Sequence, residues 1–322
     1  MKTRFLILDM HNLFIRNFVV NPTLSANTGD PIGGVIGSLR SLQKLARMFQ
    51  PSHIFAVWDG SGGSRKRRQK QKDYKSGRKP LNLNRAIDLQ PDEIEQNKLW
   101  QMLRLREYIA DFPIIQLQFD STEADDVIAH LVSKYPEQQK VIVSSDKDFI
   151  QLLQNNTTLL YRPIQDVILH RKNVTQEFGI QPCNFAIARA VVGDKSDNIT
   201  GLRGVGLKTL AKRFPELGEP RDIYITELVS MAQKRLAEKS LKIYEQIANG
   251  TKIIQKNYEI IQLYRPMVTP QITMVIERVV KEFEPQFAKT NTFKRLARDG
   301  ADVDFTGLFQ YFQSLEWDQP KI

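Results

Sequence analysis

The stretch Phe119–Phe149 decides the predicted fold and reads FDSTEADDVIAHLVSKYPEQQKVIVSSDKDF. It begins with an acidic cluster, Ser121–Asp126, which opens a segment whose apolar residues recur at helical spacing. Val141–Ser144 then forms a short β-branched run that stops just before Asp146 and Asp148. Parallel α/β sheets present ligands at the carboxyl ends of their strands. A strand that ends in two carboxylates therefore predicts a metal site.

Each half of this stretch also has a simpler explanation. Thr122 is a suitable helix cap, and first-turn acids are stabilised by the helix dipole by about 0.3–1 kcal/mol each. Asp146-Lys147-Asp148 after a strand is equally compatible with a solvated turn. The metal interpretation gains weight only if other strands end in the same way.

Other apolar runs do end in acids. Phe5–Leu8 runs into Asp9, and His53–Trp58 runs into Asp59. Ile114–Phe119 leads to the acidic cluster, and residues 35–49 and 91–111 between these runs have helical periodicity. Residues 159–161 and 167–169 resemble a terminal hairpin. This alternation predicts an α/β fold with a mostly parallel central sheet flanked by helices.

Length and composition narrow the class of protein. The 322 residues are enough for about two domains, and the 41% hydrophobic content is enough for real cores. The net charge of +10 and the pI near 9.5 favour an anionic partner, first of all nucleic acid. Cys183 is the only cysteine, which excludes a disulfide framework and a cysteine zinc site. That single cysteine fits a reducing cytosol. Asp9 interrupts the first apolar run, so we expect no signal peptide, and no later run approaches the ~20 apolar residues of a membrane span. We therefore expect a cytoplasmic location.

A basic segment follows the second strand. Arg65–Lys79 contains nine Lys or Arg, one acid and Tyr74, and it has no apolar periodicity. Such a run is usually a solvated face or a mobile arm, and it is also compatible with a localisation signal. Its place beside Asp59 favours a third interpretation, in which it attracts a polyanion towards the acidic strand ends.

The second half of the chain is predicted to be mostly short helices. Gly201, Gly204 and Gly206 precede a helix over Leu207–Phe214, and a glycine hairpin at a helix start lets backbone N–H groups approach a phosphate. That pattern alone is weak evidence. From Glu216 onward the sequence indicates helices, and we expect the apolar cluster Phe305–Trp317 to dock on the core rather than to bind a partner.

Carboxylates at strand ends or in Asp-x-Asp and Asp-x-x-Asp clusters make up the candidate site. If they met at one sheet edge they would repel one another unless hard divalent cations neutralised them. Oxygen ligands indicate Mg²⁺ or Mn²⁺. Two such ions about 3.5–4 Å apart hydrolyse phosphodiesters. The predicted ligands are Asp9, Asp59, Glu123, Asp125, Asp126, Asp146, Asp148, Asp194 and Asp197.

As an ordered set, these motifs resemble those of the flap endonuclease and 5′→3′ exonuclease family. The family includes the 5′-nuclease domain of bacterial DNA polymerase I and free-standing phage enzymes with RNase H-type activity. The resemblance covers about residues 1–214 and rests on Leu8-Asp9, Trp58-Asp59-Gly60, Tyr74-Lys75-Ser76-Gly77-Arg78, Glu123-Ala124-Asp125-Asp126, Ser144–Phe149 and Gly193–Ile199.

The resemblance implies three regions. Residues 1–180 would form a PIN-like nuclease core with a helical arch at about 62–112. Residues 181–250 would form a helix-hairpin-helix module that grips duplex DNA, with K⁺ as a further ligand. Residues 251–322 would form a helical region packed on the core. No polymerase follows the nuclease motifs, so we expect a stand-alone enzyme of phage type.

It also implies roles for individual residues. Asp9, Asp59, Asp125, Asp126 and Asp146 would serve the first metal, with Asp148, Asp194 and Asp197 on the second side and Glu123 nearby. Lys75 and Arg78 would contact the scissile phosphate and stabilise the charge that develops in the transition state, and Asp146 and Asp148 would also be catalytic. Tyr74 would stack or pack near the displaced end. The implied DNA contacts are Gly33, Gly34, Tyr74, Lys75, Arg78, Gly204, Gly206, Lys208, Thr209 and Lys212.

The expected activity is a structure-specific, Mg²⁺-dependent 5′ nuclease that removes 5′ flaps and RNA primers in replication or repair. Expected partners are branched or nicked duplex DNA with a 5′ single strand, RNA–DNA hybrids, and a single-strand-binding protein or clamp, with the enzyme a monomer. Two alternatives remain open: a catalytically silent branched-DNA binder and a PIN-type ribonuclease. Ser121-Thr122, Trp58, Thr200 and Arg203 depart from the family pattern, which affects substrate stacking and K⁺ binding rather than the metal site.

Overall fold

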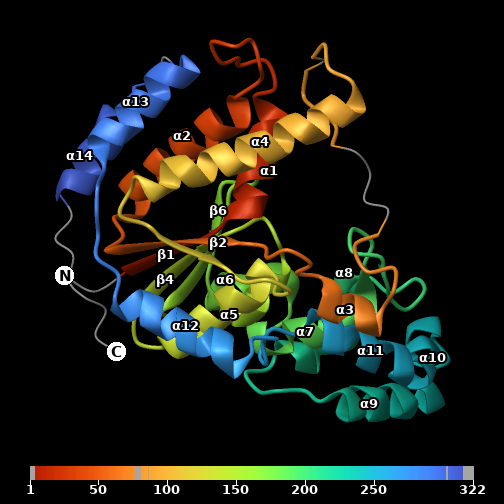
Figure 1. The fold of residues 1–322 in the computed structure, drawn as a ribbon. Helices are drawn as coiled ribbons and strands as arrows, with labels where there is room; N and C mark the ends of the chain where they lie inside the picture. The colour runs from red at the N-terminus through yellow and green to blue at the C-terminus, as the bar shows by residue number, and fades with distance from the viewer. Residues whose placement is uncertain (1–3, 77–80, 86, 302–303, 315–322) are drawn as a thin grey trace.

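The computed structural model describes residues 4–76, 81–85, 87–301 and 304–314. Its central sheet has the strand order β3-β2-β1-β4-β5-β6, parallel except for the β5–β6 pair (Figure 1). The predicted parallel sheet and terminal hairpin are therefore confirmed. The strands are β1 (Arg4–Asp9), β2 (His53–Trp58), β3 (Ile115–Gln118), β4 (Gln139–Val143), β5 (Thr158–Arg162) and β6 (Val167–Leu169).

The central strands are buried on both faces, and their alternate residues point to opposite sides. Phe5 and Ile7 of β1 belong to one hydrophobic cluster, whereas Leu6 and Leu8 belong to another on the opposite face. The order of the strands also reverses beside β1, since β2 and β3 extend the sheet on one side of β1 and β4 on the other. Ligands bind at such a switch point in open α/β sheets.

The helices on one face are α1 (Met10–Val20), α2 (Gly33–Phe49) and α4 (Pro91–Ala110), joined by α13 (Lys289–Asp299) and α14 (Thr306–Ser314) (Figure 1). The aromatic cluster of α14 docks on the core as predicted, because Phe312 stacks on Phe112 with ring centroids 5.0 Å apart. Trp317, the last member of that predicted cluster, lies outside the described residues.

Towards the other face and the carboxyl edge lie the remaining helices. They are α3 (Arg65–Lys70), α5 (Ala124–Lys134), α6 (Arg171–Phe178), α7 (Pro182–Val192), α8 (Leu207–Arg213), α9 (Ile225–Glu238), α10 (Lys242–Asn249), α11 (Thr251–Ile261) and α12 (Pro270–Lys281). Short elements complete the fold: 3-10 turns η1 (Asp148–Leu152) and η2 (Pro215–Gly218), and the pair β7 (Gly193–Asp194) and β8 (Ile199–Thr200).

The predicted domain boundaries near residues 180 and 250 stay a prediction. One hydrophobic cluster runs continuously from Phe5 through Phe185 to Val280, so it crosses both boundaries. Within the described ranges, we find no helix that is both long and apolar enough to cross a membrane.

Candidate active site

The switch point of the sheet carries the first two carboxylates. Asp9 ends β1 and caps α1, accepting a hydrogen bond from the Asn12 backbone N–H at 3.1 Å. Ser144 is the first residue after β4, and its hydroxyl donates to the other oxygen of Asp9 at 2.8 Å. The same hydroxyl accepts from the backbone N–H of Asp146 at 3.1 Å. These bonds fix Asp9 and Asp146 to the two central strand ends.

Asp59 at the end of β2 is joined to the acidic cluster. Its Oδ1 accepts from the backbone N–H of Ala124, 2.8 Å away, at the first residue of α5. Gly60 packs so closely on Phe119 that a Cβ would come within 1.7 Å of a carbonyl oxygen, so glycine is required there. The ends of β2 and β3 and the start of α5 therefore converge at one edge.

Three carboxylates from distant segments share one small cavity. Asp125 of α5, Asp148 of η1 and Asp197 of the β7–β8 turn line it together. Burial and the charge of Asp146 raise the pKa of Asp148 to about 7. Burial also raises the pKa of Asp125, with Asp146 and Glu123 adding to the effect against the opposing charge of Lys75. Mutual repulsion of this kind is what a cation would relieve.

The carboxylates predicted for the second metal are bridged by a cation that the sequence did not reveal. Arg189 of α7 donates to Asp148 at 2.8 Å and pairs with Asp194 through its other nitrogen. The only sequence signal was one charged residue in the apolar run Ala186–Val192. Despite burial, the Ser196 hydrogen bonds and Arg189 hold the pKa of Asp194 below its usual value.

Glu123 and Asp126 contact basic side chains instead of the central cavity. Arg67 of α3 pairs with Glu123, and it contacts both oxygens of Asp126 at 2.6 and 3.2 Å. Asp126 also accepts from the backbone N–H of Met267 at 2.8 Å. Lys75 Nζ lies 2.8 Å from Glu123 Oε1. A metal-binding role for Glu123 and Asp126 stays a prediction.

The arch residues differ in their surroundings. Lys75 has a left-handed backbone, φ 54°, which is uncommon for a residue with a side chain and often marks functional sites. Tyr74 is 3% exposed and packs with Ile199, Ile260 and Ile261, so its ring is covered in this arrangement rather than open for stacking. Arg78 lies outside the described residues.

The residues fit a hard divalent ion in their chemistry. The donors that converge are carboxylate oxygens, and burial together with neighbouring acids raises the pKa of several of them, including Asp9, whose pKa is about 7 through burial and the charge of Asp59. Across the parts of the chain that the structure describes, however, no three His, Cys, Asp or Glu side chains are grouped closely enough to hold a metal ion.

The two predicted glycine segments differ in exposure. Gly33 and Gly34 are buried, and the N–H of Gly34 already donates to the Gln101 side chain of α4 at 2.8 Å. In contrast, Gly204, Gly206, Lys208, Thr209 and Lys212 are all exposed. Gly204 has φ 77°, a conformation that favours glycine. The second segment is thus open to a ligand, whereas the first contributes close packing.

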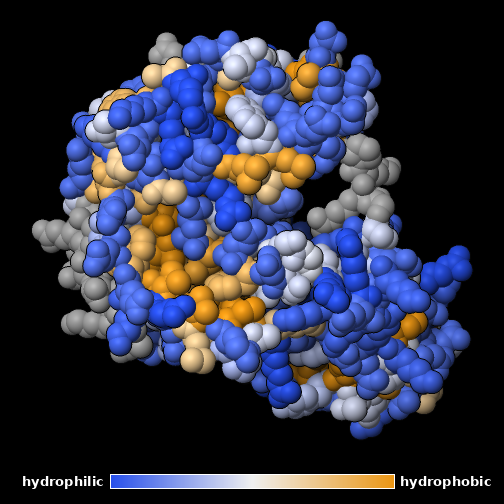
Figure 2. Space-filling view, viewed as in Figure 1, coloured by the Kyte–Doolittle hydropathy of each residue, from blue (hydrophilic) through white to orange (hydrophobic). Residues whose placement is uncertain are grey.

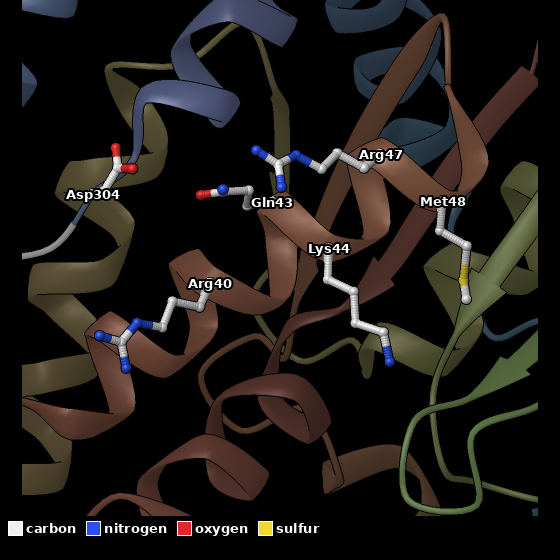
Figure 3. A pocket seen from close by; sticks show the side chains of 6 residues that line it. All are labelled: Arg40, Gln43, Lys44, Arg47, Met48 and Asp304. Carbon is white, nitrogen blue, oxygen red and sulfur yellow. The ribbon is translucent and has the colours of Figure 1, made fainter.

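Two hollows lie outside the carboxylate cavity. Figure 2 shows an opening between the part that carries α4 and the part that carries α3 and α8. A separate cavity of about 610 Å³ lies beside α2, and it is lined by side chains of that helix, among them Arg40, Lys44 and Arg47, and by Asp304 from the segment before α14 (Figure 3). None of the predicted site residues lines that second cavity.

Comparison with known proteins identifies relatives of this chain. Residues 4–179 match the family model described as the 5′-3′ exonuclease, N-terminal resolvase-like domain. A 5′-3′ exonuclease of Aquifex aeolicus is 33% identical over 69% of this chain and 72% of its own length. The flap endonuclease Xni of Psychromonas ingrahamii is 32% identical over 70% of this chain and 81% of its own. The chain spans only a quarter of the related DNA polymerase I of Caldicellulosiruptor bescii.

Solved structures confirm the fold. The 5′-exonuclease of bacteriophage T5 with bound zinc has a TM-score of 0.64 at 16% identity, covering 97% of this chain and 98% of its own. A complex of the T5 flap endonuclease with DNA and metal ions also scores 0.64, at 17% identity over 92% of this chain and 99% of its own. The PIN-like α/β architecture is therefore confirmed, and the chain belongs to the 5′-3′ exonuclease family.

Proposed function

We propose that this protein is a metal-dependent 5′ nuclease that cuts phosphodiesters near junctions of single-stranded and duplex DNA. As a member of its family it is a phosphodiester hydrolase. The observation that supports the finer assignment is the cavity shared by Asp125, Asp148 and Asp197, because those carboxylates come from three segments up to 72 positions apart (197 − 125). Arg189 and Lys75 offset part of the repulsion among these acids, and divalent cations would relieve the rest.

Divalent ions, Mg²⁺ first and Mn²⁺ as a substitute, fit this set of donors. Asp9, Asp59, Asp125, Asp146, Asp148, Asp194 and Asp197 would hold them, and bound ions would supply an activated water and stabilise the leaving oxygen. We assign Asp126 to a structural role, since Arg67 and the Met267 N–H occupy its oxygens.

The chain's own residues supply orientation and charge. Lys75 carries its ammonium beside Glu123 at the rim of the acidic cavity, where it can approach a scissile phosphate. Arg189 holds Asp148 and Asp194 in place from α7. The exposed Gly204–Lys212 segment suits the phosphates of a duplex. K⁺ binding at that segment, an arch role for Arg78 and stacking by Tyr74 remain proposals.

Branched or nicked DNA with a 5′ single strand is the proposed substrate. The flap endonuclease of bacteriophage T5, which shares this fold, has been crystallised with DNA and metal ions, and this supports the choice by analogy. The opening between α4 and α3 offers a passage for one strand (Figure 2). RNA–DNA hybrids, a partner clamp or single-strand-binding protein, and a cytoplasmic location are predictions from the sequence.

A labelled 5′-flap assay tests the proposal. The substrate is a flap whose junction is defined, incubated with Mg²⁺ or with a chelator, and binding is measured in parallel. We expect Mg²⁺-dependent products that end near the junction. Tight binding without cleavage in Mg²⁺ or Mn²⁺ would instead favour the silent binder, and preferential cleavage of unpaired RNA would favour a PIN-type ribonuclease.

A further inference from the structure

The side chain of Glu123 is contacted by four residues of one short segment. Ser64 and Lys75 donate to its Oε1 at 2.7 and 2.8 Å. Arg67 pairs with its Oε2, and the Tyr74 hydroxyl lies 3.4 Å from the same atom. The carboxylate is only 2% exposed. The buried side chain of Glu123, at the start of α5, thus contacts both ends of the segment 64–75.

Arg67 extends this connection to two further elements. It contacts both oxygens of Asp126, and its Nε donates to the backbone carbonyl of Ile260 near the end of α11, 2.9 Å away. Its side chain is 4% exposed, although its neighbours in α3 at positions 65 and 68 are exposed. Burial opposes the charge, but Asp126 and Glu123 raise the pKa of Arg67, so it stays a cation.

The same contacts determine where Lys75 lies. Its ammonium is held by Glu123, and its backbone N–H donates to the Asp197 carbonyl at 3.1 Å. Its left-handed backbone is an uncommon conformation for a residue with a side chain, and it persists only when the surroundings fix it. The segment lacks an apolar periodicity of its own, so these polar contacts fix it together with the packing of Tyr74.

We infer that Arg67 is a positioning residue for the reaction: by clamping Glu123 and Asp126 to the end of α11, it fixes the root of the basic segment and so places Lys75 at the acidic cavity. This inference rests on the proposed nuclease function. Arginine suits the role because its planar fork reaches two carboxylates and a carbonyl at once, whereas a lysine presents a single point charge.

The proposal also gives Glu123 a different role from the metal ligand that the sequence predicted. Arg67 contacts one oxygen of Glu123 and Lys75 contacts the other, so two cations face this buried carboxylate. An anion engaged in this way anchors the basic segment. The carboxylates that face the cavity are those of Asp125, Asp148 and Asp197 instead.

The first test is a double-mutant cycle on the full chain. Single-turnover cleavage of the flap at saturating DNA is compared for Arg67→Gln, Lys75→Ala and the double variant, with Arg67→Lys as the conservative change. Arg221→Gln, an exposed arginine of a surface ion pair, serves as the matched control. We expect a rate loss of about tenfold or more for Arg67→Gln with Kd for DNA nearly unchanged, and partial recovery in Arg67→Lys.

In the Lys75→Ala background, Arg67→Gln should cost less than about twofold, because Arg67 acts through Lys75. Equal losses in both backgrounds, or a loss that appears only in Kd, would overturn the inference. Thermal melting shows whether Arg67→Gln folds, and the cycle is run with Arg67→Lys if it does not.

A second measurement does not require cleavage. Amide hydrogen exchange over residues 64–76 should accelerate in Arg67→Gln while exchange in β1 and β4 stays unchanged. Unaltered exchange over 64–76 would refute the clamp even if the enzyme were active. Inactive wild-type protein with accelerated exchange in the variant would refute the proposed nuclease function and leave the clamp intact.

Discussion

Asp148 shows how one side chain links the electrostatics of the site to its chemistry. Its pKa of about 7 lies above the ordinary value of 3.8, first through burial and then through Asp146. The folded protein therefore binds more protons than the unfolded chain between about pH 4 and 7, and this carboxyl destabilises the fold increasingly as the pH rises through that window.

We predict that Asp148→Asn abolishes cleavage yet raises the melting temperature in chelator at pH 8. The gain should vanish near pH 4, where the wild-type carboxyl is protonated. DNA affinity should change little, because phosphate contacts elsewhere dominate binding. Melting curves at both pH values and a flap assay provide the check. Full activity in this variant would contradict the role of Asp148.

At the residue scale, the sequence predicted acids better than cations. Asp9, Asp59 and Asp148 could be found because each follows an apolar run whose end the parallel sheet places at one edge. Arg67 could not, since it stands in a run of nine cations and only its distant partners at 123, 126 and 260 distinguish it from Arg68. Arg189 stands alone in an apolar run, and the sequence did not reveal that Asp148 and Asp194 are its partners.

At the scale of elements, α4 is joined to α13 by a buried polar cluster. Arg104 donates to both oxygens of Asp299 at 2.7 Å, and the Tyr108 hydroxyl donates to the same carboxylate at 2.7 Å. Asp299 is 7% exposed. The C-terminal helices are thus fixed to α4 by charge as well as by the aromatic contacts of α14.

Arg104→Met should lower the free energy of unfolding by about 3–5 kcal/mol, because it removes the cation that contacts both oxygens of the buried Asp299 and leaves only the Tyr108 hydroxyl and the more distant Arg298 beside it. The matched control Lys294→Met removes an exposed cation from the same helix, α13, and it should change stability by no more than about 0.5 kcal/mol. Urea unfolding measures both. Equal changes in the free energy of unfolding for the two substitutions would show that the buried ion pair stabilises the fold no more than an exposed cation does.

Element types followed from periodicity, but their contacts did not. The helices over 91–110 and 207–213 and the strands at 53–58 and 139–143 arise from local patterns. The packing of Gln101 against the start of α2 joins residues 67 positions apart, Gly34 and Gln101, and nothing in either segment predicts it. The expected DNA contact of Gly33 and Gly34 came from the family resemblance and stays a prediction.

At the scale of the whole molecule, the basic residues behind the net charge of +10 differ in exposure. Some cations are buried against carboxylates, as Arg67 and Arg104 are, whereas Arg65, Arg68, Lys70 and Lys72 are exposed around α3. Exposed cations beside the acidic edge release counterions from a bound polyanion.

Replacing Arg65 and Lys72 with Gln should therefore flatten the dependence of log K on log salt by about 0.7–0.9 per residue. Fluorescence anisotropy with a flap substrate at several salt concentrations measures the slope. Arg298→Gln is the control, because α13 lies on the opposite side of the molecule from α3 (Figure 1). An unchanged slope in the double variant would mean that α3 does not contact DNA.

The central claim is that acids from distant segments converge on divalent cations. Anomalous diffraction from a crystal soaked in Mn²⁺ tests it most directly. We predict Mn²⁺ peaks among Asp125, Asp146, Asp148 and Asp197, weakened in the Asp148→Asn variant. Peaks confined to other parts of the surface, or none at this cavity, would contradict it.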